Sequence, residues 1–380
     1  MVQDIVLAAL FTEISKKEYN MTKKQFLRSI AFFLVVAIMI FTLCDLFEIE
    51  NTTTASRRFY SYRQLTDDTV DAVIIGTSGS DRYWIPTQGY EEYGIALYPL
   101  CTDAFPSWLY IHAIEDALSY QDVKLFVLDI RPFGQDNDNL NTMDVRARRL
   151  LDVMSPFSVN RFKAAITTIK TRVEANPTTD MFDLSYFFSF IKYHSKWEDE
   201  DYSFSDNFGS KAHDYMGFFV SRKATVLQTK LDKKTYDPDT KLDLDPISKK
   251  ALYELIDYIK ANDLEVLFVD SPQIRGNKET GRSNTVYEIL EKEGMNYISY
   301  YSENSDNGFI IDLDTDTDFY NAGHVNFYGA TKFTEHLAAY INENYDLPDR
   351  RTDENAVAEW DGVHEKLLDK IKELENAKKK

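Results

Sequence analysis

The chain has few cysteines and few basic residues, and both shortages restrict what it can be. Only two cysteines occur among 380 residues, and Cys44 falls within a long apolar segment, so a structural disulfide to Cys101 is not expected. No group of cysteines and histidines has the spacing of a zinc site. The 43 Lys and Arg residues are outnumbered by 62 Asp and Glu, which gives a formal net charge of -19. Binding to a phosphate backbone needs a basic face, so the composition argues against a nucleic-acid-binding protein.

Apolar and aromatic residues, in contrast, are plentiful. Hydrophobic residues make up 44% of the chain, which contains 24 Tyr and 25 Phe. A chain of this length and composition can bury a full hydrophobic core, and disorder is not expected over most of it.

The longest apolar run covers residues 30–47 and reads IAFFLVVAIMIFTLCDLF. Counted from Leu27 it has about 20 residues, enough for a helix to cross a bilayer core of about 30 Å. Lysines and an arginine precede it, so the positive-inside rule predicts a cytoplasmic segment over residues 1–26 and a transmembrane anchor over 27–47. The rest of the chain is then extracytoplasmic, and the protein is a single-pass protein of the cell membrane. A cleaved signal peptide is the alternative, but its apolar part would span only about 7–15 residues.

Residues 69–350 show the alternation of strands and helices that is typical of an α/β fold. Nearly continuous apolar runs at 70–75, 124–130 and 264–269 have the length of strands buried on both faces of a parallel sheet. Helical spacing of apolar residues returns between and after these strands, most clearly at 247–261. The pattern predicts a doubly wound, mainly parallel sheet.

Three other segments lack this alternation. Residues 48–68 are polar and are interpreted as a stalk. Residues 135–245 are polar and aromatic by turns, without strand patterns, and are interpreted as an inserted helical subdomain. Residues 351–380 have apolar residues at helical spacing and predict an amphipathic helix that packs on the domain or on a partner helix.

Two loops lie where an α/β sheet usually carries its chemistry, beyond the carboxyl ends of its strands. Ser78 follows the first strand directly, at a strand-to-helix turn that exposes a hydroxyl. His324 precedes the last major helix, where a histidine can act as general base toward a serine while a group three residues earlier, here Asn321, holds its other ring nitrogen. Each loop alone has a simpler interpretation, a tight turn or phosphate-type loop in the first case and an isolated loop histidine in the second. Together they favour a nucleophile and its base.

A serine after the first strand, followed much later by a histidine before the last major helix, is the arrangement of the SGNH/GDSL esterase and acyltransferase superfamily, which the sequence resembles. More narrowly, it resembles membrane-anchored bacterial SGNH-like proteins related to the D-alanyl-lipoteichoic-acid transfer protein and the alginate O-acetylation proteins. The resemblance is carried by DAVIIGTS (71–78), EEYGIALYPL (91–100), KLFVLDI (124–130), YHSKW (193–197), VLFVDSP (266–272) and DFYNAGHVNFYGATKFTEHL (318–337). It implies a flavodoxin-like arrangement of the sheet, with Ser78 as nucleophile and His324 as base.

The resemblance also implies a function. A serine esterase or O-acyltransferase of this type would act on a cell-envelope polysaccharide or wall polymer through an acyl-serine intermediate. Relatives work beside a membrane-bound O-acyltransferase, so such a partner is expected, in addition to contact with the membrane through one helix. The resemblance implies no metal and no organic cofactor.

The chain departs from the family pattern near the expected site. Asn321 stands where the family has an aspartate, which makes Asp316 and Asp318 the candidate substitute acids. Cys101 stands where the family has a glycine that donates a backbone N–H to the oxyanion, and a backbone donor survives a change of side chain, so Cys101 and Gly79 are the oxyanion candidates. These departures keep open a second interpretation, a catalytically weak or inactive SGNH-like adaptor that binds a polymer or the acyltransferase partner.

The hydrogen-bond partners of His324 distinguish the two interpretations. A carboxylate on its Nδ1 would favour an enzyme. A lone Asn321, with Ser78 beyond hydrogen-bond reach, would favour the adaptor.

Overall fold

The computed structural model describes residues 22–47, 54–156, 158–179, 183–198, 213–220 and 237–378. At its centre is a five-stranded sheet with the strand order β2-β1-β3-β4-β5, in which every neighbouring pair is parallel. The strands are β1 (Ala72–Gly76), β2 (Leu97–Cys101), β3 (Leu125–Asp129), β4 (Val266–Asp270) and β5 (Tyr297–Ser299). Every residue of β1 to β4 is buried, as the continuous apolar runs predict for a sheet covered on both faces. The prediction of an α/β fold with a mainly parallel sheet is confirmed.

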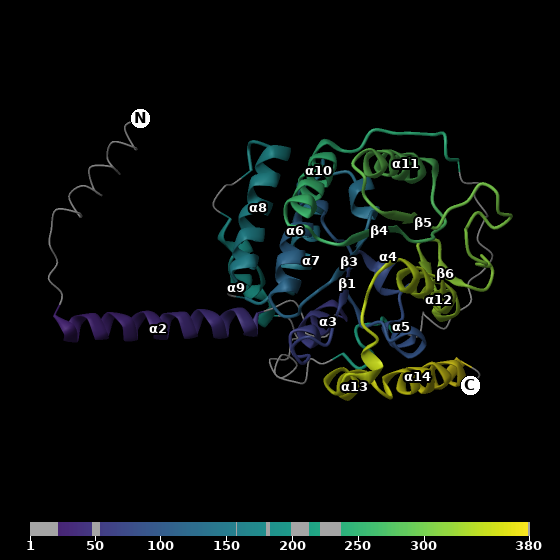
Figure 1. The fold of residues 1–380 in the computed structure, drawn as a ribbon. Helices are drawn as coiled ribbons and strands as arrows, with labels where there is room; N and C mark the ends of the chain where they lie inside the picture. Colours follow the sequence, from purple (N-terminus) through teal and green to yellow (C-terminus); the bar gives the residue numbers. More distant parts are fainter. Residues whose placement is uncertain are drawn as a thin grey trace.

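Helices cover both faces of the sheet, and the side chains of each strand alternate between two apolar cores (Figure 1). In β1, Val73 packs in the core under α6 (Tyr110–Leu118), α10 (Pro246–Ala261) and α11 (Asn277–Lys292). Ile74 points the other way, into the core shared with α12 (Phe327–Asn344). The remaining elements of the second face include α5 (Pro86–Tyr93), which packs against α12.

Helix α2 (Lys23–Leu46) projects from the domain (Figure 1). Thr22 caps its first turn, because its hydroxyl accepts a hydrogen bond from the N–H of Gln25. Its stretch Lys23–Cys44 has a mean hydropathy of 2.4 and is the one helix in the described part of the chain that is long and apolar enough to cross a membrane. This part of the anchor prediction is shown; which side of a membrane each end lies on stays a prediction. The predicted cytoplasmic residues before Thr22 lie outside the described residues.

The segment after α2 differs from the expected polar stalk. Residues 54–62 form helix α3 (Thr54–Tyr62), in which Arg58, Phe59 and Tyr62 are buried. The polar composition of this segment does not indicate exposure, because the guanidinium of Arg58 is buried in the domain and pairs with the buried carboxylate of Asp81. Helix α3 is therefore part of the domain, and the remaining stalk residues before it, 48–53, lie outside the described part.

An inserted helical subdomain over residues 135–245 stays a prediction, and the described residues 213–220 and 237–245 contain no helix. The described residues between 135 and 198, in contrast, are largely helical. They form α7 (Leu140–Leu151), α8 (Val159–Ala175) and α9 (Ser189–Tyr193), with 3-10 turns at Leu184–Tyr186 and His194–Glu198. Apolar residues of α7 and α8 belong to the same core as the neighbouring face of the sheet. These helices therefore extend that face and share its core.

The C-terminal segment forms two helices, whereas one was predicted. They are α13 (Glu354–Trp360) and α14 (Val363–Lys378), and the chain turns between them at Gly362, whose φ of 71° belongs to the left-handed region that glycine adopts easily. Trp360, Leu367 and Ile371 are buried, so the segment packs on the domain, one of the two partners that its apolar side predicts.

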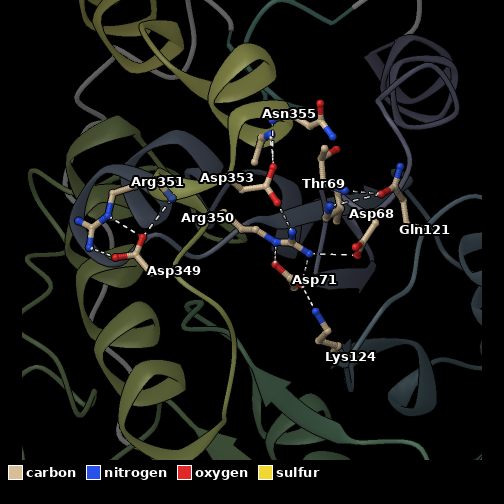
Figure 2. Close-up of polar contacts among 12 residues, drawn as sticks. Asp68, Thr69, Asp71, Gln121, Lys124, Asp349, Arg350, Arg351, Asp353 and Asn355 are labelled. Atoms are coloured by element: carbon tan, nitrogen blue, oxygen red, sulfur yellow. Dashed lines mark hydrogen bonds and ion pairs between the residues drawn. The ribbon is translucent and has the colours of Figure 1, made fainter.

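A buried arginine fastens this C-terminal segment to the start of β1 (Figure 2). Arg350 donates from Nε and Nη2 to the two carboxylate oxygens of Asp71, at 2.6 and 2.8 Å. It also pairs with Asp68 at 3.0 Å and with Asp353, the cap of α13, at 2.7 Å. Lys124 adds a second cation to Asp71 at 2.6 Å. The buried carboxylate of Asp71 is thereby shared by three segments that are distant in sequence.

Replacement of Arg350 by methionine is expected to lower the free energy of unfolding by about 3 kcal/mol, because it leaves Asp71 buried with Lys124 alone. Arg351→Met is the matched control: this neighbouring guanidinium pairs with Asp349 at the surface, so a change within about 0.5 kcal/mol is expected. Urea unfolding of both variants measures the difference. Equal effects would show that the Arg350 cluster does not hold the C-terminal segment.

Candidate functional site

The first component of the site is the turn that leaves the carboxyl end of β1. Thr77 caps the short helix α4 (Ser78–Asp81), and Asp129 at the end of β3 accepts hydrogen bonds from Thr77 N and Oγ1 at 3.1 and 2.5 Å. The ends of the two strands approach so closely that a Cβ at Gly76 would lie 2.3 Å from Cβ of Asp129. Glycine at this position lets Asp129 fix the turn, which places Ser78 at the edge of the sheet.

The second component is a short antiparallel hairpin, β6 (Phe319–Asn321) and β7 (His324–Val325), which precedes α12. The hydroxyl of Tyr83 donates to the carbonyl oxygen of Pro272 and also lies 3.1 Å from the carbonyl oxygen of Gly323 in the hairpin turn. The His324 ring stacks on Tyr320 with 5.4 Å between ring centroids and 8° between the planes. The imidazole is therefore held on one face by a ring of its own hairpin.

Ser78, His324 and Asn321 form a continuous chain of hydrogen bonds. Ser78 Oγ lies 2.8 Å from His324 Nε2, and His324 Nδ1 lies 2.8 Å from Asn321 Oδ1. The N–H of Gly323 also donates to Asn321 Oδ1, at 2.9 Å. Because a backbone N–H can only donate, the amide oxygen must face both groups, so His324 Nδ1 carries the ring proton. Nε2 then offers its lone pair toward Ser78, which is the tautomer that a general base requires.

Arg82 competes with Ser78 for that lone pair. Its Nη1 lies 3.0 Å from His324 Nε2, and its guanidinium rests on the Phe219 ring, 4.4 Å from the centroid. Burial, followed by the charges of Arg82 and Arg131, lowers the pKa of His324 from 6.5 to about 3. His324 is therefore neutral at ordinary pH and able to accept a proton, but a protonated state is disfavoured while Arg82 remains in place.

Replacement of Arg82 by glutamine is expected to raise the pKa of His324, because it removes one of the two charges that oppose protonation. With a higher pKa, His324 becomes protonated and unable to act as a base at a higher pH. The acidic limb of any pH–activity profile that depends on His324 should therefore move to higher pH. NMR titration of labelled imidazoles measures the pKa directly, with the His324 signal assigned by its loss in His324→Gln.

Arg149→Gln is the control for this titration. Arg149 is exposed and shares the partner Asp103 with Arg82, but it is not a partner of His324. The assigned effect of Arg82 would be contradicted if the pKa of His324 in Arg82→Gln equals that of the wild type, or if Arg82→Gln and Arg149→Gln shift it equally.

Beside Ser78 and His324 lies a cavity of about 350 Å³. Its lining includes three arginines, Arg131, Arg146 and Arg275, and two acidic residues, Asp103 and Glu279. The cavity therefore places charged groups next to the serine hydroxyl and is large enough for a small group of a substrate.

Arg131 takes up the space beside Gly79. A Cβ at Gly79 would lie 1.7 Å from Arg131 Nη1, so the guanidinium packs directly on the glycine backbone. Its Nη1 and Nη2 contact the carbonyl oxygens of Gly323 and Ser271 at 3.5 and 3.4 Å. The same guanidinium thus contacts the turn of Ser78, the hairpin of His324 and the loop after β4.

The N–H of one oxyanion candidate, Gly79, has another partner in this structure. The N–H of Gly79 donates to Thr77 Oγ1 at 3.2 Å. Cys101 is fully buried in β2, its carbonyl accepts a hydrogen bond from Arg58 at 2.7 Å, and burial raises the pKa of its thiol. The cavity is lined instead by Asp103 and Ala104, from the loop after β2.

The candidate substitute acids do not reach the imidazole. The carboxylate of Asp318 binds Lys332 at 2.7 Å and accepts from the N–H of Asp314 at 2.8 Å. Asp316 is exposed, in the loop before the hairpin. Asn321 therefore holds His324 Nδ1 in this structure, while Ser78 stays within hydrogen-bond reach, so the site combines one feature of each interpretation.

Arg82 and Arg131 are the residues of this site that sequence reasoning missed. A signal for each is present in the sequence: Arg82 is four residues after Ser78, which places both on one side of a helical turn, and Arg131 lies two residues after the carboxyl end of β3.

Comparison with known proteins adds no family assignment. No protein-family model matches the chain, and no curated protein matches it significantly. What can be said of its class comes from the fold and the site: an α/β protein with a serine–histidine pair at the carboxyl edge of a parallel sheet.

Proposed function

We propose that this chain is a membrane-anchored serine esterase or O-acyltransferase in which Ser78 is the nucleophile and His324 the general base. The observation that carries the proposal is the hydrogen-bond chain Ser78 Oγ–His324 Nε2 and His324 Nδ1–Asn321 Oδ1, with both distances at 2.8 Å. A serine and a histidine with a purely structural role in their turns would not require the histidine tautomer that directs a lone pair at the serine hydroxyl. The cavity beside the pair gives a substrate access to the hydroxyl.

The geometry supports a two-step acyl transfer. Ser78 Oγ attacks the carbonyl carbon of an acyl donor while its proton passes to His324 Nε2, and collapse of the tetrahedral intermediate returns that proton to the departing group. His324 then takes the proton of an acceptor hydroxyl as that oxygen attacks the acyl-serine. The bond between the acyl carbon and Ser78 Oγ breaks, the proton on His324 returns to Oγ, and the new ester leaves. With water as acceptor, the same step is hydrolysis.

Arg82 has a role in this proposal as a charged donor to the oxyanion. Its Nη1 and Ser78 Oγ are both within 3.0 Å of the same nitrogen, so the guanidinium lies close to the carbon that would be attacked. A positive donor at this place is worth most in the tetrahedral intermediate, where the negative charge develops.

The substrate and setting in the proposal come from the resemblance of the sequence to SGNH-like proteins of the bacterial envelope. The domain would lie outside the cytoplasmic membrane and act on a cell-envelope polysaccharide or wall polymer. A membrane-bound O-acyltransferase would supply the acyl group. One apolar helix of membrane-spanning length supports the placement at a membrane.

Two observations favour the second candidate, a catalytically weak adaptor. His324 is oriented by an amide, which stabilises an imidazolium less than a carboxylate does, and Arg82 further opposes its protonation. An adaptor would bind a polymer or the acyltransferase partner with the same cavity and would not need to form an acyl-enzyme.

Replacement of Asn321 by aspartate is expected to raise the rate of ester turnover by about 10- to 100-fold. In a well-studied triad the reverse change lowers the rate about 10⁴-fold, partly through the wrong tautomer. Here the Gly323 N–H already enforces the correct tautomer, so only the electrostatic part of that factor is to be gained. Steady-state kinetics with an activated ester measures the change.

Asp316→Asn is the control for this gain, because Asp316 is exposed and away from the imidazole; no change is expected. Turnover that is unaffected by Asn321→Asp, or lowered by Asp316→Asn, would contradict the assigned partner of His324.

The proposal is tested by the release of nitrophenol from a short-chain nitrophenyl ester, with the full chain in nanodiscs. Ser78→Ala is expected to reduce release to the uncatalysed level. Ser283→Ala is the matched control: Ser283 lines the same cavity, but its hydroxyl binds Arg275, and its loss should leave turnover largely intact. Equal rates for the wild type and Ser78→Ala would reject Ser78 as the nucleophile.

A further inference from the structure

The C-terminal end of α2 is built into the domain. Cys44, near the end of the helix, is 2% exposed, and its carbonyl oxygen accepts a hydrogen bond from Ser189 Oγ of α9 at 3.1 Å. A helix that ends in a packed contact fixes the direction of the domain relative to itself. If α2 crosses a bilayer, one side of the domain must therefore face that bilayer.

That side is formed by α8, α9 and the 3-10 turns Leu184–Tyr186 and His194–Glu198. Figure 1 shows α8 and α9 at the end of the domain nearest to α2, with α8 running across the direction of α2. The elements are tied together, since Phe162 of α8 packs on Phe187 with 5.6 Å between ring centroids, and Arg161 Nη1 donates to the Phe187 carbonyl at 2.5 Å. They form one surface at the level where α2 enters the domain.

This surface exposes large apolar side chains. Outside α2, ten large hydrophobic residues of the described chain are exposed, and five of them lie on these elements. They are Val159, Ile166, Leu184, Ile191 and Trp197. Trp197 is 65% exposed, although an indole in a soluble domain is usually covered.

The residue types and their spacing fit the region of lipid headgroups. On α8 the exposed positions Val159, Lys163, Ile166 and Lys170 recur at helical spacing, so apolar and basic side chains share the outer face. Tryptophan is enriched at the membrane–water interface, and lysine stems cover apolar surface there while the ammonium group reaches the headgroups. A surface in contact with water gains no comparable stabilisation from an indole that is 65% exposed.

We propose that the surface formed by Val159, Ile166, Leu184, Ile191 and Trp197 rests on the lipid bilayer that α2 crosses. The domain then contacts the membrane through this surface as well as through its anchor, and cannot rotate freely about α2. This inference depends on α2 spanning the membrane and not on the catalytic role of Ser78. It holds or fails independently of acyl transfer.

Trp197 makes the proposal directly measurable, because the other three tryptophans are buried. Trp84, Trp108 and Trp360 are 0%, 8% and 1% exposed, so only Trp197 can meet a quencher at the surface. The full chain is reconstituted into nanodiscs of phosphatidylcholine and phosphatidylglycerol, with part of the phosphatidylcholine brominated on its acyl chains. Tryptophan emission is then compared with and without bromine, and in the presence of acrylamide, which quenches from the water.

Brominated lipid is expected to reduce the emission, with a greater loss when the bromine is close to the headgroup than when it is near the methyl ends. Trp197→Phe should abolish the loss and keep the fold, because the residue is exposed. In Leu184→Glu combined with Ile191→Glu, Trp197 remains and the loss should become smaller.

Two results would overturn the proposal. In one, acrylamide quenches Trp197 and brominated lipid does not, which places the surface in water. In the other, neither quencher reaches Trp197, which places a protein partner or a second copy over the surface. Ester turnover in the same nanodiscs, dependent on Ser78 or not, reports separately on the proposed function.

Discussion

Ser78→Ala and His324→Ala are each expected to lower ester turnover by about 10⁴- to 10⁶-fold, and the double variant should be no worse than either single variant. The reason is that Ser78 Oγ and His324 Nε2 act as one unit across a 2.8 Å hydrogen bond. Without the base, the hydroxyl has no group to accept its proton; without the hydroxyl, the base has no nucleophile to activate. Losses of this kind are not additive.

The four turnover rates, for the wild type, the two single variants and the double variant, form a complete cycle. Circular dichroism and urea unfolding check that each variant is folded, which is expected because neither side chain belongs to an apolar core. Additive losses would mean that the two residues act in separate steps. A His324→Ala variant with wild-type turnover would remove the proposed base altogether.

Arg58→Met is expected to lower the free energy of unfolding by about 3 kcal/mol, because it leaves the buried carboxylate of Asp81 with only the longer contact to Arg82 Nε, at 3.8 Å. Arg58 Nη2 lies 2.8 Å from Asp81 Oδ2, and the two side chains are 0% and 3% exposed. The same guanidinium donates to the carbonyl oxygens of Cys101 and Gly217, both at 2.7 Å. One arginine thus joins α3, the end of β2 and the helix that Ser78 opens.

The loss should also depend on pH. Burial raises the pKa of Asp81, and Arg58 is the main group that opposes the rise. In Arg58→Met, the buried carboxyl gains stability by binding a proton, so the variant should recover part of its stability as the pH falls toward the raised pKa. Arg57→Met is the control, because Arg57 directly precedes Arg58 in α3 and is exposed. Urea unfolding between neutral and acidic pH measures both, and a loss below about 1 kcal/mol would contradict the assigned role of the buried pair.

The central sheet could be predicted from the sequence because its strands are buried on both faces. Such strands appear as short continuous apolar runs; β3 lies within its predicted run, and β1 and β4 each end one residue beyond theirs. The hairpin of β6 and β7 could not, because its strands have only three and two residues, too few to show a pattern along the chain. Helix α3 could not be predicted either, because a polar composition suggests an exposed stalk and does not show that Arg58 pairs with Asp81 inside the domain.

The candidate site was predictable in its reactive atoms and not in its electrostatics. Ser78 and His324 could be placed together because Ser78 follows the first strand and His324 precedes the last major helix, and both loops lie at the carboxyl edge of the sheet. The partner on Nδ1 stayed open, since three nearby side chains could have filled it, and it is Asn321 in the structure. The spacing of four residues from Ser78 places Arg82 on the same side of the turn, but it does not specify the 3.0 Å contact between Arg82 and His324.

The most direct test of an activated Ser78 is its reaction with a fluorophosphonate, followed by intact-mass measurement of the full chain in detergent or nanodiscs. The account predicts one adduct per chain, absent in Ser78→Ala and retained in the cavity control Ser283→Ala. A folded wild-type protein that forms no adduct, or one that forms the same adduct in Ser78→Ala, would contradict the assignment of Ser78 as an activated nucleophile.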